Sequence, residues 1–373
     1  MNRPDATSTQ PAAAATSEDR PPIVIDSSPD PEPTLPTAPA RRRGDADRRA
    51  GGPLVAVVIP CYNEAAAIAD VIEGFAASLP DAEIHVFDNN STDDTSGIAR
   101  AHGATVHFVT PRGKGNVVRR MFADVDADVY VMVDGDATYQ ADIASELVDR
   151  LIDGNRDMIV GQRVTEQEAG EEYRSGHVLG NVAFTKLYNV LFQTTFEDVF
   201  SGYRVMTRRF VKSFPATTSG FDIETELIVH AAELRVETDE VPTVYKARPE
   251  GSTSKLSTYK DGWRIFVSAI RLYKSTAPVR FFGAFAFLTT VAAWVLGIPI
   301  ISEYIETNRV DRFPTAFLAA SLQVIALVLA TAGLVINAVE QVSREQRQLA
   351  FLSIPRPRPR AQRLPDAGSD PAA

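Results

Sequence analysis

Residues Val129 to Tyr139 read VYVMVDGDATY, a run of β-branched and apolar residues that ends on two aspartates. Short apolar runs of this kind are typical of buried parallel strands. In open α/β sheets, ligands bind at the carboxyl ends of such strands, which is where Asp134 and Asp136 are expected. The segment therefore predicts an α/β fold with two carboxylates at its ligand-binding edge, although Asp-Gly is also a common turn pair.

Two carboxylates separated by one glycine suit a divalent cation that also carries phosphate oxygens. Mg²⁺ and Mn²⁺ favour oxygen ligands and share their coordination shell with substrate phosphates. For this triplet alone, an acidic turn that binds no metal is an equally good interpretation. The residues at the neighbouring strand ends distinguish the metal site from the acidic turn.

The segments before Val129 alternate as a doubly wound sheet requires. Helices that alternate with short apolar strands indicate a mostly parallel, doubly wound sheet. After Arg163 the pattern is mixed. Strands are predicted at 54–60, 83–88, 105–109 and 129–133, and helices at 65–79, 93–102 and 114–124.

A polar cluster follows each of the four predicted strands. The clusters are IPCYNE at 59–64, DNNSTDD at 88–94, PRGKG at 111–115 and DGD at 134–136. Each has an ordinary explanation on its own, since Asn-Ser-Thr-Asp is a good helix cap and Arg-Gly-Lys-Gly a good turn. Because the carboxyl ends of parallel strands meet at one edge, four clusters in register favour a crevice for a nucleotide-type ligand.

The order of these clusters resembles family 2 glycosyltransferases of the GT-A type. Within that family it is similar to the polyprenyl-phosphate sugar transferases, relatives of dolichol-phosphate mannosyltransferase, from Leu54 to Lys255. The resemblance implies a GT-A (Rossmann-like) sheet with Mg²⁺ or Mn²⁺ as cofactor. It also implies inverting transfer of a hexose from a nucleotide-diphosphate sugar, GDP-mannose or a UDP-hexose, to polyprenyl phosphate.

The same resemblance assigns roles to individual residues. The planar guanidinium of Arg163, in the Gly161-Gln162-Arg163 element, would bind a phosphate. Asp136, Arg163 and Arg204 are the predicted catalytic residues, and Arg204 belongs to an SGYR element at 201–204. The metal would bind Asp134, Asp136 and Gln162. The predicted substrate-binding residues are Pro60, Tyr62, Glu64, Asp88, Lys114, Asp134, Gly135, Arg163, Arg248 and Lys255.

The acceptor side matches the family less well. Arg248 and Lys255 resemble the family's late phosphate-side segment, and a functional role is favoured for them and for Arg204 over a solvated surface or helix-end charge. The acceptor-side Arg and Ser of some relatives have no clean counterpart here. Arg174, His177 and Asn181 are only candidates for that role.

Two stretches without charged residues, 281–301 and 313–339, predict transmembrane helices. At ~1.5 Å per residue the first reaches roughly 30 Å, the thickness of a bilayer core. A buried soluble hairpin is the alternative. Before the first stretch, residues 263–274 (WRIFVSAIRLYK) mix apolar residues with Arg and Lys, which predicts an interfacial helix.

Basic residues precede the first stretch and follow the second. The positive-inside rule therefore places the catalytic domain and both termini in the cytoplasm. We therefore expect an integral membrane protein. The expected parts are a disordered tail at 1–52, a glycosyltransferase domain at 53–257, an interfacial juxtamembrane helix at 258–280, spans at 281–301 and 313–339, and a basic disordered tail at 340–373.

Composition limits the other function classes. A formal net charge of -10 argues against a general nucleic-acid binder. The single cysteine, Cys61, excludes an intramolecular disulfide and fits a reducing compartment. No apolar signal-peptide core occurs between Met1 and Ala50. The expected partners are a nucleotide-sugar donor, a polyprenyl-phosphate acceptor and the lipid bilayer, and a homo-oligomer stays open.

Three alternatives compete with transfer to a lipid phosphate. A lipid hydroxyl as acceptor would need a general base, for which Asp222, Glu224 and Glu226 are candidates. A processive polysaccharide synthase relative would carry a Q-x-x-R-W element, which this sequence lacks. A catalytically inactive membrane scaffold should have lost some of the strand-end carboxylates, which are present here.

Overall fold

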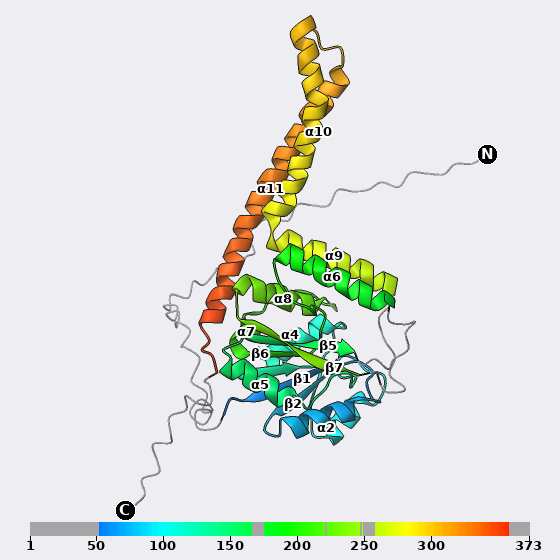
Figure 1. Ribbon diagram of the computed structural model, residues 1–373, viewed down its shortest axis with the longest axis vertical. Coiled ribbons are helices and arrows are strands. Elements are labelled where there is room, and N and C mark those ends of the chain that lie inside the picture. The colour runs from blue at the N-terminus through cyan, green and yellow to red at the C-terminus, as the bar shows by residue number, and fades with distance from the viewer. Residues whose placement is uncertain (1–51, 166–174, 221, 247, 249–257, 358–373) are drawn as a thin grey trace, which may run out of the picture. The chain divides into compact units, whose positions relative to one another are not determined.

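The described part of the protein contains one mixed, mostly parallel sheet of seven strands (Figure 1). The computed structural model describes residues 52–165, 175–220, 222–246, 248 and 258–357. The strand order is β3-β2-β1-β4-β6-β5-β7, and only β6 runs against its neighbours. This confirms the predicted fold class. The strands are β1 (Val55–Cys61), β2 (Glu83–Asp88), β3 (Thr105–Phe108), β4 (Val129–Met132), β5 (Met158–Thr165), β6 (Arg204–Thr207) and β7 (Thr238–Tyr245).

The first half of the domain follows the sequence pattern closely. Strand β2 and helix α4 (Lys114–Asp124) have the predicted bounds, and β1, β3 and β4 end within one residue of theirs. Helices α2 (Ile68–Ser78) and α3 (Thr95–Ala101) begin later than predicted. The residues before them form turns, in which the Glu64 carbonyl accepts from the amides of Ala67 and Ile68.

Helices cover both faces of the sheet (Figure 1). Helices α2, α3 and α5 (Ala144–Asp153) pack on one face, where α2 buries Ile68, Val71, Ile72 and Phe75 as its pattern predicts. Helices α4, α7 (Arg208–Ser213) and α8 (Ile223–Leu234) pack on the other face. Phe75 is 1% exposed, a burial that stabilises the fold by about 2–3 kcal/mol. Two apolar layers thus fix the sheet whose edge carries the polar clusters.

Two further helices, α6 (Ser175–Phe192) and α9 (Thr258–Thr276), lie side by side. The rings of Phe192 and Tyr273 meet with centroids 6.3 Å apart. Helix α9 ends just before α10 begins at Pro278, so it occupies most of the segment predicted as a juxtamembrane helix. The pair therefore stands next to the start of the apolar helices.

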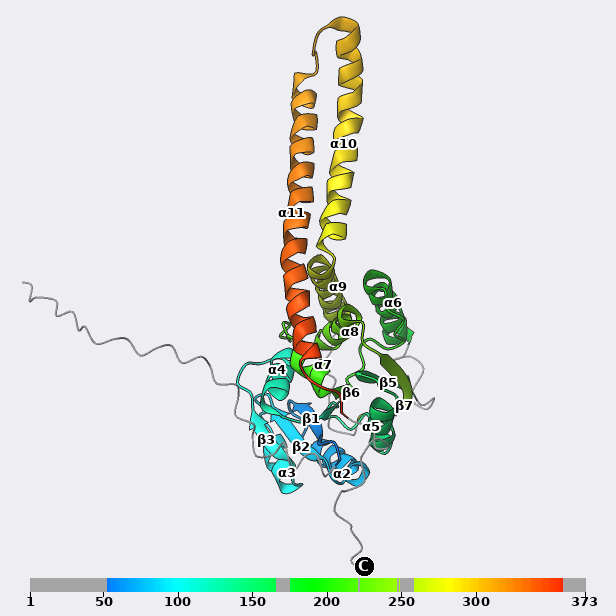
Figure 2. The same ribbon diagram turned by 90° about the vertical axis from the view of Figure 1, so that its left-hand side faces the viewer.

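Helices α10 (Pro278–Thr307) and α11 (Phe313–Leu352) form an antiparallel hairpin (Figure 2). Both are long and apolar enough to cross a membrane. Small side chains at seven-residue spacing are buried between them: Ala286 and Ala293 on α10, and Ala319, Ala326 and Gly333 on α11. A Cβ at Gly333 would lie only 3.0 Å from the Cβ of Phe282. Small residues thus let the two backbones approach closely, a kind of packing that is common between membrane helices.

The predicted disordered tail at 340–373 is wrong in its first part, because α11 continues without a break to Leu352. This part of the helix is held by the domain that contains the sheet: Arg347 pairs with Glu233 at 3.1 Å, and Phe351 is buried. Beyond the helix, Arg356 pairs with Asp157 at 2.8 Å. Residues 1–51 and 358–373 lie outside the described residues, so the predicted tails there stay predictions.

Candidate active site

The carboxyl end of β2 places Asp88 at the sheet edge, where it is only 4% exposed. The Ser91 amide donates to Asp88 Oδ1 at 2.8 Å, and the Ser96 hydroxyl donates to Oδ2 at 2.5 Å. Ser91 belongs to the turn that leads into α3 and Ser96 to the first turn of that helix, so the chain after β2 folds back onto Asp88. The carboxylate is therefore oriented before any ligand arrives.

Asn89 connects this strand end to the loop after β3. Its side-chain amide donates to the carbonyls of Val109 and Pro111, both at 2.8 Å, and its Oδ1 accepts from the Gly113 amide at 2.7 Å. Gly113 has φ 121°, a conformation that favours glycine. This geometry starts α4 at Lys114 and aims the lysine at the next strand end.

Lys114 lies between two carboxylates. Its Nζ is 2.5 Å from Asp134 Oδ1 and 2.5 Å from Glu224 Oε1 at the start of α8. Burial alone would lower the pKa of Lys114, but the two carboxylates outweigh burial and hold that pKa above its ordinary value. Burial raises the pKa of Glu224, although Lys114 opposes the shift. The lysine thus stays cationic at the sheet edge.

Asp136 is held from two directions and is 4% exposed. The Thr138 hydroxyl donates to its Oδ1 at 2.6 Å, and Arg248 Nη2 lies 2.7 Å from its Oδ2. Arg248 follows β7 in the chain and precedes α9. The arginine therefore links this carboxylate to the segment that leads to the apolar helices.

Two glycines allow the close packing around the carboxylates. A Cβ at Gly135 would lie 2.6 Å from Cys61 Sγ, so the DGD triplet rests directly on the end of β1. A Cβ at Gly202 would lie 2.4 Å from Asp134 Oδ2. The Gly202 amide also donates to the hydroxyl of Tyr139 at 2.8 Å. The SGYR element thus forms one wall against Asp134.

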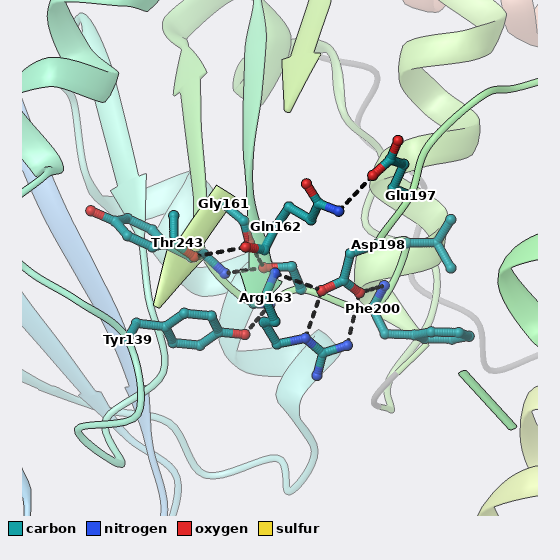
Figure 3. A network of polar contacts seen from close by, with 12 residues as sticks. Tyr139, Gly161, Gln162, Arg163, Glu197, Asp198, Phe200 and Thr243 are labelled. Atoms are coloured by element: carbon teal, nitrogen blue, oxygen red, sulfur yellow. Dashed lines mark hydrogen bonds and ion pairs between the residues drawn. The ribbon is translucent and has the colours of Figure 1, made fainter. Parts of the chain in front are cut away.

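The side chains of Gln162 and Arg163 pair with a different acidic segment (Figure 3). The Gln162 amide donates to Glu197 Oε2 at 2.6 Å. Arg163 makes a bidentate pair with Asp198, with Nε at 2.7 Å and Nη2 at 2.8 Å. Burial would raise the pKa of Asp198, but Arg163 outweighs burial and holds the pKa below 3.8. Among the described residues, these side chains form their hydrogen bonds with Glu197 and Asp198 and not with Asp134 or Asp136.

Arg204 has a supporting position. Its side chain is fully buried, and its guanidinium donates to the carbonyls of Ser201 at 3.1 Å and Val199 at 3.0 Å. The catalytic role predicted for Arg204 from the sequence stays a prediction, and what the structure shows is that its side chain supports the neighbouring loop. The hydrogen bonds shape the loop that carries Gly202 against Asp134.

The remaining predicted residues fall into two groups. Near the end of β1, Glu64 is 8% exposed and Tyr62 lies under the guanidinium of Arg112, 5.9 Å from the ring centroid. Pro60 is the last residue but one of the same strand. Lys255 and Arg174 lie outside the described residues, as does the side chain of His177.

Sequence reasoning missed several residues that the structure brings into the network. Glu224 had been considered only as a base, whereas it is a partner of Lys114. Asp198 precedes the SGYR element in an acidic pair that no motif singled out. Asn89, Tyr139 and Gly202 make contacts that only the folded arrangement reveals.

The carboxylates of Asp134 and Asp136 fit a hard divalent cation. Asp134 already pairs with Lys114, and Asp136 already pairs with Arg248. Positive charge is therefore favourable beside both carboxylates. In the described part of the chain, no three His, Cys, Asp or Glu side chains gather closely enough to hold a metal alone. Two carboxylates suit Mg²⁺ or Mn²⁺ beside a phosphate, because these ions typically share their coordination shell with phosphate oxygens.

Comparisons with known proteins agree with this geometry. A family model described as glycosyl transferase family 2 matches residues 56–214. Glycosyltransferase AglJ of Haloferax volcanii is 36% identical over 257 residues, which cover 67% of this chain and 82% of that protein. The chain belongs to glycosyl transferase family 2. It is therefore a glycosyltransferase, and the resemblance carried by the four clusters is confirmed.

Two further proteins are similar to parts of the chain. Protein RfbJ of Shigella flexneri is 58% identical over 125 residues, covering 33% of this chain and 95% of that protein. A dolichyl-phosphate hexose transferase of Haloferax volcanii is 29% identical over 218 residues, covering 58% of this chain and 93% of that protein. The similarity to family members thus extends well beyond the DGD triplet.

Proposed function

We propose that this glycosyltransferase moves a hexose from a nucleotide-diphosphate sugar, GDP-mannose or a UDP-hexose, to a polyprenyl phosphate at the cytoplasmic face of a membrane. The observation that carries the proposal is the ion pair of Arg248 with Asp136. This pair joins the strand-end carboxylates to the segment that enters α9 and the apolar helices. The dolichyl-phosphate hexose transferase among the relatives supports the same kind of acceptor.

The donor would lie along the carboxyl ends of β1, β2 and β4. The oriented Asp88 carboxylate accepts hydrogen bonds from a base or a ribose hydroxyl, beside Pro60, Tyr62 and Glu64. Asp134 and Asp136 would hold Mg²⁺ or Mn²⁺, which when bound neutralises the diphosphate and stabilises it as the leaving group. Lys114 stays cationic and can exchange its carboxylate partners for a phosphate. Gly202 keeps Asp134 in place for this contact.

Transfer to a phosphate needs no general base. A phosphate oxygen of the acceptor is already anionic at neutral pH, so the chain has to position it for in-line displacement with inversion at the sugar carbon. Arg248 and Lys255 would orient the acceptor phosphate, and Arg163 would supply a further guanidinium once it leaves Asp198. Arg204 supports the loop beneath. Charge stabilisation by positioned cations then lowers the barrier.

The described carboxylates fit a base-catalysed alternative less well. Glu224 is engaged by Lys114 at 2.5 Å. Glu226 accepts from the amides of Thr217 and Thr218 at 2.9 and 3.1 Å. Asp222 accepts from the Ser268 hydroxyl at 2.7 Å. Since each of the three has a structural partner, a phosphate acceptor is favoured over a hydroxyl that would need one of them as base.

The membrane side of the proposal is supported by the pair α6 and α9. Both helices expose apolar side chains to the surroundings, Val190 on α6 and Trp263, Phe266 and Ile270 on α9. Trp263 is 68% exposed, and burying such a ring in a headgroup region is favourable. We infer that both helices rest at the membrane interface, which would bring a lipid phosphate level with Arg248.

The test is transfer by the purified full chain in detergent. Sugar nucleotides of the GDP and UDP series are offered with undecaprenyl phosphate, with and without Mn²⁺, and lipid products are separated by mass. We expect one donor to give a lipid-linked hexose that needs the metal. The Asp136→Asn variant should lose roughly a hundredfold or more of this activity. Asp153→Asn, a charge-matched change at the end of α5, should keep it. The absence of lipid product with every donor would defeat the proposal.

A further inference from the structure

A pocket of about 350 Å³ lies where the end of α8 meets α11, away from the strand-end site. Its lining consists of Glu233, Leu234 and Arg235 from the end of α8 and Arg344, Arg347 and Gln348 from α11. Arg235 ends α8 in the left-handed conformation, with φ 53°, and its side chain is exposed. The pocket is thus built from two helices that are distant in sequence.

Positive charge prevails in this pocket. Arg347 lies 3.1 Å from Glu233 and 2.6 Å from Glu340, and Arg344 Nε lies 3.4 Å from Glu233. Three arginines therefore face two carboxylates, which leaves one net positive charge. Burial raises the pKa of Glu233, although Arg347 and Arg344 oppose the shift.

The pocket stands at the level where the chain enters its apolar hairpin. Arg344 donates to the carbonyl of Thr276, the last residue of α9. Helix α10, whose apolar stretch is long enough to span a bilayer, starts at Pro278. On α11, exposed Val335 and Val339 lie one to three turns before Arg344. If α10 and α11 span the bilayer as proposed, the arginines lie at the depth of the headgroups.

We propose that this pocket binds the phosphate headgroup of an anionic phospholipid from the surrounding bilayer. Guanidinium groups suit phosphate because they offer several donors in one plane. Basic pockets beside membrane helices on the cytoplasmic side are suited to anionic headgroups. The proposal rests on the membrane insertion of the hairpin, but it does not depend on the identity of donor or acceptor.

The test uses the purified full chain in nanodiscs of phosphatidylcholine mixed with phosphatidylglycerol, and native mass spectrometry counts the phosphatidylglycerol that stays bound. Recovery of protein in the nanodisc fraction separately reports membrane insertion. The wild type should retain phosphatidylglycerol. Arg235→Gln should weaken retention about fivefold, the loss expected for one cation near an anionic surface. Glu233→Gln should strengthen retention, since it removes the opposing carboxylate and leaves Arg347 its partner Glu340.

The matched control is Lys274→Gln, which removes one exposed cation from the last turn of α9 outside the pocket. It should leave retention unchanged. An equal loss for Lys274→Gln and Arg235→Gln would mean diffuse attraction to the surface and would overturn the site. Unchanged retention in both Arg235→Gln and Glu233→Gln would also overturn it. Displacement of the lipid by low concentrations of soluble glycerol 3-phosphate would show a free phosphate compound, not the bilayer, as the source.

Discussion

At the scale of single residues, the site consists of cations and carboxylates that are already paired with each other. Lys114 contacts Asp134 and Glu224, Arg248 contacts Asp136, and Arg163 contacts Asp198. A nucleotide diphosphate with its metal would compete for both halves of these pairs. We therefore expect these cations and carboxylates to give up their contacts with each other when the donor and its metal bind.

Gly202 has no side chain and so leaves room for the carboxylate of Asp134. In Gly202→Ala the new Cβ would lie 2.4 Å from Asp134 Oδ2, so the carboxylate has to move while the surrounding fold has no reason to change. We expect about tenfold or greater loss of affinity for the activating metal, measured as the Mn²⁺ dependence of nucleotide binding by calorimetry. The melting temperature should change little.

A suitable comparison for Gly202→Ala is Gly103→Ala, in a turn where a Cβ would meet no atom within 4 Å. Gly103 has φ 87°, so this variant tests backbone strain without touching the site. Normal metal dependence in Gly202→Ala would contradict the close contact with Asp134.

Asp198 gives the pair with Arg163 a definite pH dependence. Its folded-state pKa lies below 3.8, so the folded protein keeps the carboxylate ionised where the unfolded chain takes up a proton. The pair therefore stabilises the fold fully above pH 3.8, and this stabilisation is lost as the pH falls through the folded-state pKa. Asp198→Asn should unfold more easily than the wild type at neutral pH, by about 3 kcal/mol.

The measurement is chemical unfolding of both proteins in detergent across the acid range. The difference in free energy of unfolding should shrink as the pH drops below 3.8. Glu197→Gln, which affects the neighbouring contact with Gln162, should show no comparable trend. A difference that grows toward acid would contradict the sign argued here.

At the scale of elements, the end of α11 is tied to the far edge of the sheet. Asp157, immediately before β5, accepts hydrogen bonds from Arg209 Nε and Nη2, each at 2.6 Å, and from Arg356 Nη2 at 2.8 Å. The Arg209 guanidinium also lies over the ring of Phe351, 4.3 Å from its centroid. These contacts couple the end of α11 to the strand end opposite the active site.

The contribution of this tie is measurable by substitution. Asp157→Ala should destabilise the domain by about 3 kcal/mol, because it leaves Arg209 buried without its carboxylate. Arg356→Gln removes only a partly exposed partner and should cost about 1 kcal/mol or less. It should nevertheless make the chain after Leu352 easier to cleave, which limited proteolysis with mass analysis detects. Equal protection in Arg356→Gln and the wild type would refute the tie.

The sequence predicted the elements whose pattern is local. Strand β2 and helix α4 matched because their apolar spacing and flanking turns need no distant partner. The reversed direction of β6 could not be read, since a short buried strand has the same apolar pattern in either direction.

The same limit applies to the site and to α11. The DGD, DNNSTDD and PRGKG clusters were predictable because parallel strands bring their ends together. The pairing of Arg163 with Asp198 and the burial of Arg204 depend on a loop whose course follows from tertiary packing. Residues 340–356 carry charges typical of a solvated tail, yet Glu233 pairs with Arg347 and Asp157 pairs with Arg356 from far along the chain.

At the scale of the whole molecule, the charges around the apolar stretches of α10 and α11 predict how the hairpin would lie across a membrane. The end of α10 and the link to α11 contain Arg309 and Arg312 against Glu303, Glu306 and Asp311, a balance of two positive and three negative charges. The opposite ends of the two apolar stretches are basic, with Arg271, Lys274 and Arg280 before the first stretch and Arg344, Arg347 and Arg356 after the second. The positive-inside rule then predicts that the catalytic domain faces the cytoplasm, where nucleotide sugars are available.

Cysteine labelling tests this orientation, because the one native cysteine, Cys61, is buried and 2% exposed. In intact cells, a maleimide that cannot cross membranes should label Asn308→Cys in the link but not Ser353→Cys after α11. Permeabilised cells should give labelling at both positions, and the unmodified chain sets the background. Labelling of Ser353→Cys alone in intact cells would invert the topology and separate the site from its nucleotide donor. Equal labelling of both in intact cells would mean that the hairpin does not span the bilayer, and transfer to a membrane-borne phosphate would then have to rest on α6 and α9 alone.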